Sequence, residues 1–368
     1  MTLRSLTMPK WGLSMQEGTV GPWSVQEGAT IAEGDELVDV ETSKIVNTFE
    51  APFAGHLRRI VGREGETLPV GALLAVFGPA DAAEEEIDAF VSDFQARFVP
   101  QDEEASGAPE SVQVGIGEAR ALRAVITGVG EPPVVFLHGF GGDLDNWAAV
   151  QSALASTRRT VAIDLPGHGG STKILTGAAP ADLAADVAHA LDALDIPRAH
   201  LIGHSLGGAV ALAFALAHPE RTESLALICA AGLPGGRLDS GYLDGFLAAR
   251  RARDLAGVLS QLFADPAFAT RELAESVLKA RRLDGAEDAL AAIRRAMDSS
   301  AFAIESARLG SLQAPLLIVA SARDQIVGAP DRASLPAHAR LIVIEDAGHM
   351  PHAEKPAAVI AALRAHLG

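Results

Sequence analysis

The chain has 368 residues, of which 48% are hydrophobic, and its formal net charge at pH 7 is −17. A chain of this length can bury the cores of one large and one small domain. The negative charge argues against a nucleic-acid partner, because phosphate binding requires a basic surface. Apolar runs fall short of a membrane helix, the first residues form no apolar signal core, and Cys229 is the single cysteine. We therefore expect a soluble, cytoplasmic protein with no membrane or nucleic-acid partner.

Residues 1–80 contain an internal repeat. The segment 27–40 recurs as the segment 64–77, and each copy holds a Glu-Gly turn, a second glycine turn and an apolar strand. Repeats of this kind are supersecondary units that complete each other's core, so we predict a small two-fold β sandwich. Lys44 follows the strand of the first copy and precedes the next apolar segment, which predicts an exposed position at the tip of a hairpin.

The N-terminal region, residues 1–80, resembles the lipoyl domain of 2-oxo acid dehydrogenase complexes. The matching motifs are Met8-Pro9-Lys10, Glu17-Gly18, Glu33-Gly34-Asp35, Glu41-Thr42-Ser43-Lys44 and the turn at 51–55. The resemblance implies that this domain is a carrier and that Lys44 holds lipoate in amide linkage. The related biotinyl domain presents its lysine between two methionines, whereas Ser43 and Ile45 flank Lys44, which favours lipoate. The alternative is an ordinary lysine in an exposed turn.

Residues 81–110 are predicted to form an acidic linker. They carry one basic and ten acidic side chains and end in a segment that contains Ser, Gly and Pro. Self-repelling sequence of this kind is typical of linkers. Five apolar residues nevertheless recur at helical spacing and predict a short amphipathic helix: Ile87, Phe90, Val91, Phe94 and Phe98. Such a helix either packs on its own chain or docks a partner subunit.

From residue 111 onward, apolar strands alternate with helical sequence, a pattern typical of a doubly wound, mostly parallel sheet. Strands are predicted at 112–116, 122–127, 134–137, 160–163, 199–203, 225–229, 316–320 and 341–344. Helices are predicted at 180–194, 209–217 and 356–367. We therefore expect a single large α/β domain over residues 111–368.

Ser205 is the candidate nucleophile of this domain. It lies in GHSLG, residues 203–207, where a predicted strand turns into a predicted helix. Small residues around the serine allow the strained turn that exposes its hydroxyl. The amide groups at the start of the following helix favour negative charge at this position. The motif alone is only moderately specific, so the rest of the domain has to support it.

A nucleophilic serine requires a base and an acid that orients the base, and one common order in the chain is Ser, Asp, His. Asp324 and His349 satisfy this order, because each follows a predicted strand downstream of the serine. We predict that His349 takes the serine proton and that Asp324 holds the imidazole tautomer. Asp346 and His352 are competing candidates in less favourable positions.

The oxyanion of an acyl-transfer reaction requires backbone N–H donors. Leu206 follows the nucleophile, and Phe140 follows the predicted strand that ends before His138, so their N–H groups are the candidates. His138 and His168 are interpreted as structural residues of turns. Cys229 ends an apolar strand and is interpreted as core packing rather than as a second nucleophile.

With these motifs in order, residues 111–368 resemble the α/β-hydrolase superfamily. A helical segment from about residue 233 to 312 interrupts the sheet and is similar to the helical cap of that family. Residues 237–308 carry eleven basic and eleven acidic side chains, and the arginines considered are Arg250, Arg251, Arg253, Arg281, Arg282, Arg294 and Arg295. These arginines either lie on solvated helix faces or bind the phosphates of a bulky acyl acceptor.

The two halves together resemble one family, the dihydrolipoamide acetyltransferase (E2) of the acetoin dehydrogenase complex in its α/β-hydrolase form. The resemblance implies that a thiamine-diphosphate-dependent E1 loads acetyl onto lipoyl-Lys44 and that a flavoenzyme E3 reoxidises the dithiol. It also implies that Ser205 passes the acetyl group to coenzyme A. The chain departs from ordinary E2 subunits, since it has neither their His-x-x-x-Asp-Gly motif nor a recognisable peripheral-subunit-binding domain. A large symmetrical E2 core is therefore not expected.

Two alternatives remain at the level of sequence. Water could resolve the acyl-serine, which would make the chain a serine hydrolase (a thioesterase or esterase) fused to a lipoyl carrier. The C-terminal domain could also be a catalytically silent relic attached to a carrier, although the complete set of catalytic motifs argues against it.

Overall fold

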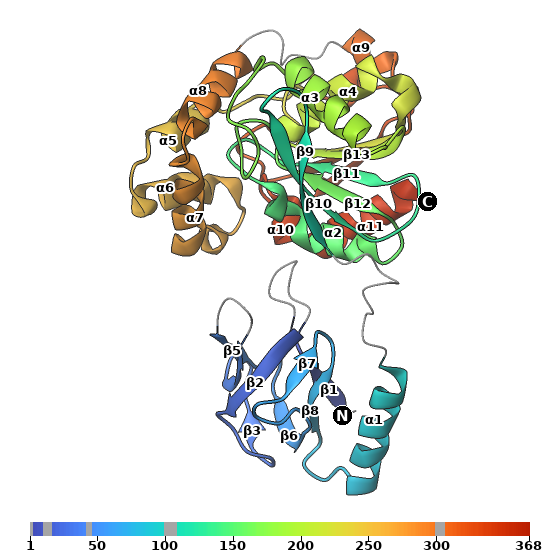
Figure 1. Cartoon of the computed structure of the whole chain (residues 1–368), viewed down its shortest axis with the longest axis vertical. Helices are drawn as coiled ribbons and strands as arrows, with labels where there is room; N and C mark the ends of the chain where they lie inside the picture. The colour runs from blue at the N-terminus through green and yellow to red at the C-terminus, as the bar shows by residue number, and fades with distance from the viewer. Residues whose placement is uncertain (1–2, 10–16, 42–45, 99–108, 299–305) are drawn as a thin grey trace. The chain divides into compact units, whose positions relative to one another are not determined.

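The computed structural model describes residues 3–9, 17–41, 46–98, 109–298 and 306–368. The chain divides into two compact units, Met1–Ser106 and Gly107–Gly368, each with its own hydrophobic core (Figure 1). Within the described residues, no helix is long and apolar enough to cross a membrane.

The N-terminal unit is built from two four-stranded sheets. One has the order β1-β8-β6-β3 and the other the order β5-β4-β2-β7, and the paired strands within each sheet are antiparallel. The strands are β1 (Arg4–Thr7), β2 (Glu17–Trp23), β3 (Thr30–Ile31), β4 (Glu36–Glu41), β5 (Val46–Glu50), β6 (Gly55–Ile60), β7 (Thr67–Pro69) and β8 (Leu73–Gly78). The predicted small all-β domain is confirmed.

The internal repeat explains the two-fold character of this unit. Strand β4 of the first copy and strand β8 of the second lie in opposite sheets, as do β3 and β7. The two repeated turn glycines have positive φ in both copies, 86° and 89° at Gly28 and Gly34, and 81° and 86° at Gly65 and Gly71. Side chains other than glycine rarely adopt this conformation, so each copy needs glycine at both turns.

Strands β4 and β5 form the hairpin predicted around Lys44. They run antiparallel with Glu41 opposite Val46, and the Thr48 hydroxyl donates a 2.7 Å hydrogen bond to Asp39 across the pair. Lys44 itself lies in the connection 42–45, which is outside the described residues.

Helix α1 (Glu84–Arg97) packs on its own unit. Ile87 is fully buried in a cluster with Leu73 and Val76 of β8, and Phe90, Val91 and Phe94 pack against that cluster. Arg59 forms ion pairs with Glu84 at 2.7 Å and Asp88 at 2.9 Å. The apolar stripe seen in the sequence therefore faces the carrier domain, as the first of its two interpretations proposed.

The C-terminal unit contains an eight-stranded sheet of order β16-β15-β14-β13-β11-β12-β10-β9. All neighbouring strands are parallel except at the β12, β10 and β9 end. The strands are β9 (Glu110–Gly115), β10 (Ala121–Thr127), β11 (Val134–Leu137), β12 (Thr160–Ile163), β13 (Ala199–His204), β14 (Thr222–Ile228), β15 (Leu316–Ser321) and β16 (Arg340–Ile344). The predicted mostly parallel α/β sheet is confirmed.

Helices cover both faces of this sheet, which explains why its central strands are continuous apolar runs. Figure 1 shows α3 and α4 on one face and α2, α10 and α11 on the other. Their bounds are α2 (Ala148–Ala155), α3 (Pro180–Ala193), α4 (Leu206–Ala217), α10 (Pro351–Glu354) and α11 (Pro356–Leu367). Short 3₁₀ turns are η1 (Leu144–Trp147), η2 (Pro219–Arg221) and η6 (Arg332–Ser334).

A helical cap is inserted between β14 and β15. Figure 1 shows α5 to α8 grouped together beside the sheet. The cap elements are α5 (Ser240–Ala248), α6 (Ala252–Leu259), η3 (Ser260–Leu262), η4 (Pro266–Phe268), α7 (Arg271–Arg281) and α8 (Ala286–Met297). Helix α9 (Ser306–Gly310) follows and lies apart from this group (Figure 1). Apolar residues of these helices, such as Leu255 and Ile293, join the core of the same unit.

Candidate active site

Ser205 lies at a sharp turn between β13 and α4. Its backbone has φ 52° and ψ −116°, a conformation that costs strain in a residue other than glycine. The glycines of the motif make this turn sterically feasible: a Cβ atom at Gly203 would collide with the backbone of Gly207, and one at Gly207 with the backbone of Leu137. The GHSLG sequence therefore produces the strained turn that presents the serine hydroxyl.

Asp324 and His349 lie on the loops that follow β15 and β16. Nδ1 of His349 and Oδ2 of Asp324 are 2.9 Å apart. The other carboxylate oxygen, Oδ1, accepts the backbone N–H groups of Ile326 at 2.8 Å and Val327 at 3.1 Å. These contacts fix the carboxylate, which in turn orients the imidazole with its Nδ1 toward the acid and its Nε2 available for another partner.

The pKa of Asp324 is lowered below its usual value by its surroundings. Burial on its own would raise the pKa, but the adjacent His349 and the hydrogen bonds from His349, Ile326 and Val327 outweigh burial. The carboxylate is thus ionised at neutral pH, the state that stabilises a positively charged imidazole.

Ser205 and His349 both line one cavity. In the described part of the chain their side chains make no hydrogen bond to each other, and such contacts often tighten only when substrate is bound. The competing candidates lie elsewhere. Asp346 is exposed and pairs with Arg323 at 3.4 Å, and His352 is buried in a stack on Trp147 with a ring separation of 4.6 Å.

The turn that carries Phe140 is fixed by His138. The imidazole Nε2 accepts the Leu165 N–H at 2.9 Å, so its Nδ1–H is the donor in the 2.8 Å contact with the Gly139 carbonyl. His138 is fully buried, which agrees with its interpretation as a structural residue. Phe140 lines the cavity beside Ser205, and Leu206 is the first residue of α4, so both proposed oxyanion donors belong to this part of the fold.

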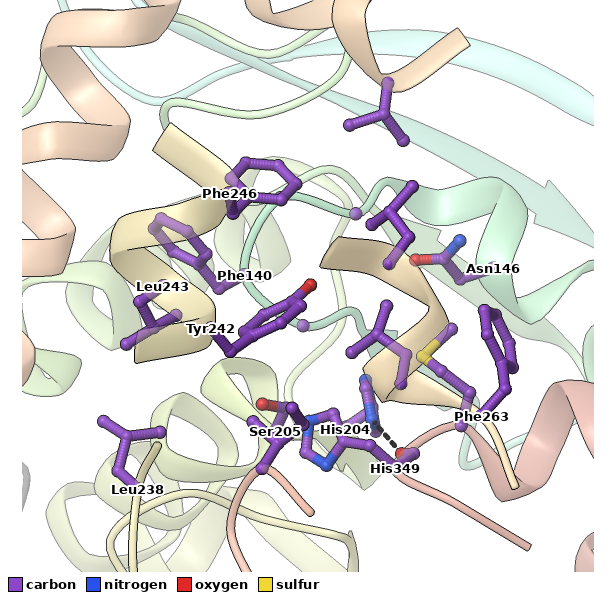
Figure 2. A pocket seen from close by; sticks show the side chains of 18 of the residues that line it. Phe140, Asn146, His204, Ser205, Leu238, Tyr242, Leu243, Phe246, Phe263 and His349 are labelled. Atoms are coloured by element: carbon purple, nitrogen blue, oxygen red, sulfur yellow. Dashed lines mark hydrogen bonds between the residues drawn. The ribbon is translucent and has the colours of Figure 1, made fainter. Parts of the chain in front are cut away.

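The cavity opens to solvent and is lined mostly by apolar side chains. Figure 2 shows Tyr242, Leu243 and Phe246 of α5 on its wall, with Phe140 nearby and Phe263 beside His349. Its lining is Gly139, Phe140, Gly141, Gly142, Asn146, His204, Ser205, Leu238, Tyr242, Leu243, Phe246, Leu259, Leu262, Phe263, Leu273, Val277, Met297, Ile326, His349 and Met350. An apolar lining with a few polar groups is typical of ligand sites.

His204 supports the loop that carries the candidate base. Its Nε2–H donates to the backbone carbonyl of His349 at 2.8 Å, and the two rings are 4.7 Å apart (Figure 2). Burial lowers the pKa of His204 well below its usual value, and His352 and His349 lower it further, so the ring is neutral. The sequence shows only that His204 precedes the candidate nucleophile, because nothing in the chain order reveals its bond to a residue far downstream.

The sequence left two interpretations for the cap arginines, solvated helix faces or binding of acceptor phosphates. Arg281 and Arg294 fit neither of them. Arg281 is 3% exposed and donates to three backbone carbonyls at the end of α5, those of Phe246, Leu247 and Ala249, and to Glu287. Arg294 is likewise buried and pairs with Asp244 and Asp298. These two arginines hold the cap together and are neither solvated nor available to phosphates.

Cys229 lies beside the candidate acid and base but is a poor nucleophile. Its sulfur is 3.5 Å from the Ser321 hydroxyl, and burial raises the pKa of the thiol well above its usual value. The donor atoms of Cys229, Asp324 and His349 lie within 4.8 Å of one another, a group that could hold a metal. A metal there would need the thiolate that burial disfavours and would occupy the two groups that face the serine.

Two residues that line the cavity were not predicted from the sequence. They are Tyr242 on the cap and Asn146 in the 3₁₀ turn η1. Tyr242 and Phe246 are one helical turn apart on α5, a spacing that could have marked them as one inward face. Asn146 belongs to η1, where its side-chain oxygen accepts the Asp143 N–H at 3.4 Å. Neither residue carries a sequence motif that would assign it to the site.

Comparison with known families and structures agrees with this architecture. The family described as alpha/beta hydrolase fold matches residues 132–356, and the biotin/lipoyl family, described as biotin-requiring enzyme, matches residues 4–77. Among solved structures, 2-hydroxy-6-oxo-6-phenylhexa-2,4-dienoate hydrolase from Rhodococcus sp. strain RHA1 is similar with a TM-score of 0.64 and 25% identity, covering 70% of this chain and 99% of that one.

Two curated relatives cover nearly the whole chain. One is the dihydrolipoyllysine-residue acetyltransferase component of the acetoin cleaving system of Pseudomonas putida, 46% identical over 96% of this chain and 95% of that protein. The protein of the same name from Cupriavidus necator is 40% identical over 100% of this chain and 98% of its own length. The chain therefore belongs to the family of dihydrolipoyllysine-residue acetyltransferase components of acetoin cleaving systems, in which a lipoyl domain is joined to an α/β-hydrolase domain.

Proposed function

We propose that this chain transfers acetyl from a lipoyl thioester on Lys44 to coenzyme A through an acyl-serine at Ser205. The observation that carries the proposal is the Asp324–His349 pair, 2.9 Å apart, beside the cavity that Ser205 also lines. A serine, an oriented imidazole and an ionised carboxylate are the groups that covalent acyl transfer requires.

Lys44 fits the attachment of lipoate. The amide linkage needs a primary amine, and Lys44 lies in the short connection between two antiparallel strands, β4 and β5. Lipoate supplies a thiol that carries the acetyl group as a thioester, on a long tether. A tether raises the local concentration of the acetyl donor at the serine without any new contact.

In the first half-reaction, the Ser205 hydroxyl attacks the carbonyl carbon of the acetyl thioester. His349 takes the serine proton at Nε2, and the negative charge on the carbonyl oxygen meets the N–H groups of Phe140 and Leu206. The carbon–sulfur bond then breaks, and His349 returns its proton to the departing sulfur. An acetyl ester remains on Ser205.

In the second half-reaction, the thiol of coenzyme A gives its proton to His349, and its sulfur attacks the acetyl-serine carbonyl. The same N–H groups stabilise the oxyanion, and the proton returns from His349 to Ser205 as acetyl-CoA leaves. Asp324 stabilises the positively charged imidazole in both halves. The apolar cap wall reduces the access of water to this ester, which favours the thiol as acceptor.

The test is to follow acetyl in the full-length, lipoylated protein, with and without coenzyme A. We expect acetyl-CoA to form in the wild-type protein and to be lost in Ser205→Ala, with lipoylation unchanged. Acetyl-CoA formation that survives Ser205→Ala would refute the serine mechanism. Rapid release of acetate that is insensitive to coenzyme A would identify the chain as a carrier-fused hydrolase instead.

The family name implies that the chain works with other components of an acetoin cleaving system. We propose that these are a thiamine-diphosphate-dependent E1, which loads the acetyl group, and a flavoenzyme E3, which reoxidises the dithiol. Lys44→Arg, which keeps the positive charge but cannot form this amide linkage, should abolish acetyl loading by E1. Loading of Lys44→Arg at the wild-type level would contradict the assignment of the carrier lysine.

A further inference from the structure

The wall of the catalytic cavity contains a polar group that the proposed mechanism does not use. Apart from Ser205 and the two histidines, the only polar side chains among the described lining residues are those of Tyr242 and Asn146. The Asn146 oxygen already accepts a backbone N–H from Asp143. The Asn146 amide nitrogen is a further donor, and Tyr242 provides the only hydroxyl besides that of Ser205 among the described lining residues.

Tyr242 lies on α5 and is 3% exposed. Figure 2 shows its hydroxyl directed into the cavity, between Phe246 and the side that carries Asn146. Within the described ranges of the chain, the hydroxyl has no hydrogen-bond partner. Burial raises the pKa of the Tyr242 hydroxyl above its usual value, so the group is a neutral donor at physiological pH.

The Tyr242 hydroxyl is not among the fully enclosed polar atoms that lack a partner, so it is open to the space of the cavity. A ligand with an oxygen acceptor at this position would pair with the hydroxyl, whereas a purely apolar ligand would cover it unpaired at a cost of about 1–3 kcal/mol. The acetyl group offers no such oxygen, because its carbonyl oxygen is directed to the N–H groups of Phe140 and Leu206. The acceptor for the tyrosine therefore belongs to the thiol side of the reaction.

The two thiols of the proposed reaction differ in where they carry an amide. The pantetheine arm of coenzyme A has an amide a short ethylene link from its sulfur, whereas the amide of a lipoyl arm lies at the far end of an apolar chain. An amide close to the sulfur lies near the wall of the cavity when the sulfur reaches Ser205. The apolar lining suits the rest of both arms.

We infer that Tyr242 is a specificity-determining residue whose hydroxyl donates to the first amide carbonyl of a pantetheine-type thiol. This inference rests on the proposed function and deepens it, because it names the group that selects the acyl acceptor. The hydrogen bond favours a thiol that carries a nearby amide over a plain alkanethiol and over water. Sites of this kind reject analogues that lack the matching polar group.

The test uses the full-length protein acetylated on Ser205 by p-nitrophenyl acetate, with N-acetylcysteamine, n-pentanethiol and dihydrolipoamide as acceptors. Thioester formation is measured for the wild type and for Tyr242→Phe, which removes only the hydroxyl. We expect kcat/KM for N-acetylcysteamine to fall about tenfold in Tyr242→Phe. The values for n-pentanethiol and dihydrolipoamide should stay within about twofold, because neither has an amide near its sulfur.

Phe246→Leu is the matched control, since Phe246 lines the same cavity one turn further along α5 and carries no hydroxyl. Phe246→Leu should change kcat/KM for N-acetylcysteamine and for n-pentanethiol by the same factor. If Tyr242→Phe lowers kcat/KM equally for N-acetylcysteamine and n-pentanethiol, or for neither, the inference is overturned. A loss confined to dihydrolipoamide would place the contact on the donor arm and would overturn it as well.

The burst of p-nitrophenolate separates this inference from the proposed function. A burst that depends on Ser205 and is unchanged in Tyr242→Phe shows that acylation is intact, so any change lies in the choice of acceptor. Release of p-nitrophenolate that is unchanged in Ser205→Ala would refute the acyl-serine, and the role of Tyr242 in acceptor choice would be refuted with it.

Discussion

Asp324 illustrates how one buried residue can be assigned a role from its contacts. Both carboxylate oxygens are engaged, Oδ2 with His349 and Oδ1 with two backbone N–H groups, and the side chain has no exposed surface. Asp346, the competing acid in the sequence, has a side chain that is 74% exposed and pairs with Arg323 on the surface. The two aspartates therefore form a matched pair for mutagenesis.

Asp324→Asn should lower the rate of Ser205 acetylation by p-nitrophenyl acetate by about 10³- to 10⁴-fold, because an amide neither fixes the tautomer of His349 nor stabilises its positive charge. Asp346→Asn should leave that rate unchanged. Acylation is followed by the p-nitrophenolate burst. A large loss in Asp346→Asn with normal acylation in Asp324→Asn would reverse the assignment of the acid.

Buried neutral histidines make the stability of the C-terminal unit depend on pH. Burial lowers the pKa of His352 to about 3, with His349 adding to the effect, and lowers that of His168 to about 3. An unfolded chain takes up protons near pH 6.5, before the folded chain does. The stability is therefore complete above about pH 6.5 and is lost as the pH falls toward about 3.

His352→Phe should flatten this pH dependence, since phenylalanine can keep the stack on Trp147 without a proton to bind. At pH 4.5, two units below the unfolded pKa, the histidine costs the wild type about 2.7 kcal/mol, and the variant should recover that amount relative to pH 7. Urea unfolding at the two pH values measures it. His338→Phe, at an exposed histidine, is the control. An identical pH dependence in His352→Phe and wild type would contradict this account.

The candidate catalytic residues Ser205, Asp324 and His349 could be proposed from the sequence because each follows a predicted strand in a fixed chain order. Tyr242, His204 and Arg281 could not, because their roles depend on contacts between segments that are distant in the sequence. His204, for example, bonds to the carbonyl of His349, and Arg281 to carbonyls of α5. Periodicity and motif spacing contain no information about such pairings.

At the scale of elements, α5 is the part of the cap that shapes the cavity, and Arg281 of α7 holds its C-terminal end. The guanidinium also lies over the Phe246 ring at 5.2 Å, and Phe246 packs against Phe140 at 5.5 Å. One buried arginine thus links a cap helix to the turn that carries Phe140, a candidate oxyanion donor.

Arg281→Lys should destabilise the protein by about 2–3 kcal/mol, because one ammonium group cannot reach the several carbonyls that the guanidinium serves. It should also raise KM for p-nitrophenyl acetate as α5 loosens. Arg282→Lys, at the exposed neighbouring residue, is the control and should change neither value. Thermal unfolding and steady-state kinetics provide the measurements. Equal effects of the two substitutions would contradict the anchoring role.

Helix α1 is an element for which the sequence left two interpretations open and packing decided between them. Its apolar stripe is covered by β8, and its acidic residues pair with Arg59. Sequence periodicity shows that a helix has an apolar face but does not say which surface covers it.

Ile87→Ala should destabilise the packing of α1 by about 2–4 kcal/mol, since Ile87 is fully buried. Amide hydrogen exchange in β8 of the full-length chain should become faster. Ser92→Ala, on the exposed side of the same helix, is the control. Unchanged exchange in Ile87→Ala, together with weaker binding of E1 or E3, would instead support a docking role for the helix.

At the scale of the whole molecule, the chain joins a carrier domain to an acyltransferase domain. Both folds were predictable, the first from its internal repeat and the second from alternating strands and helices with ordered motifs. The spacing of Tyr242 and Phe246 could mark one inward face of a cap helix, but the sequence does not show that this face lines the cavity of Ser205.

The central claim is that acetyl passes through a covalent ester on Ser205, and rapid quenching followed by peptide mass spectrometry tests it most directly. Full-length protein acetylated on its lipoyl group is quenched before and after addition of coenzyme A. The account predicts that acetyl moves from the Lys44 peptide to the Ser205 peptide without any acceptor and leaves as acetyl-CoA once coenzyme A is added. Acetyl that stays on the Lys44 peptide until coenzyme A arrives, and never reaches the Ser205 peptide, would contradict it.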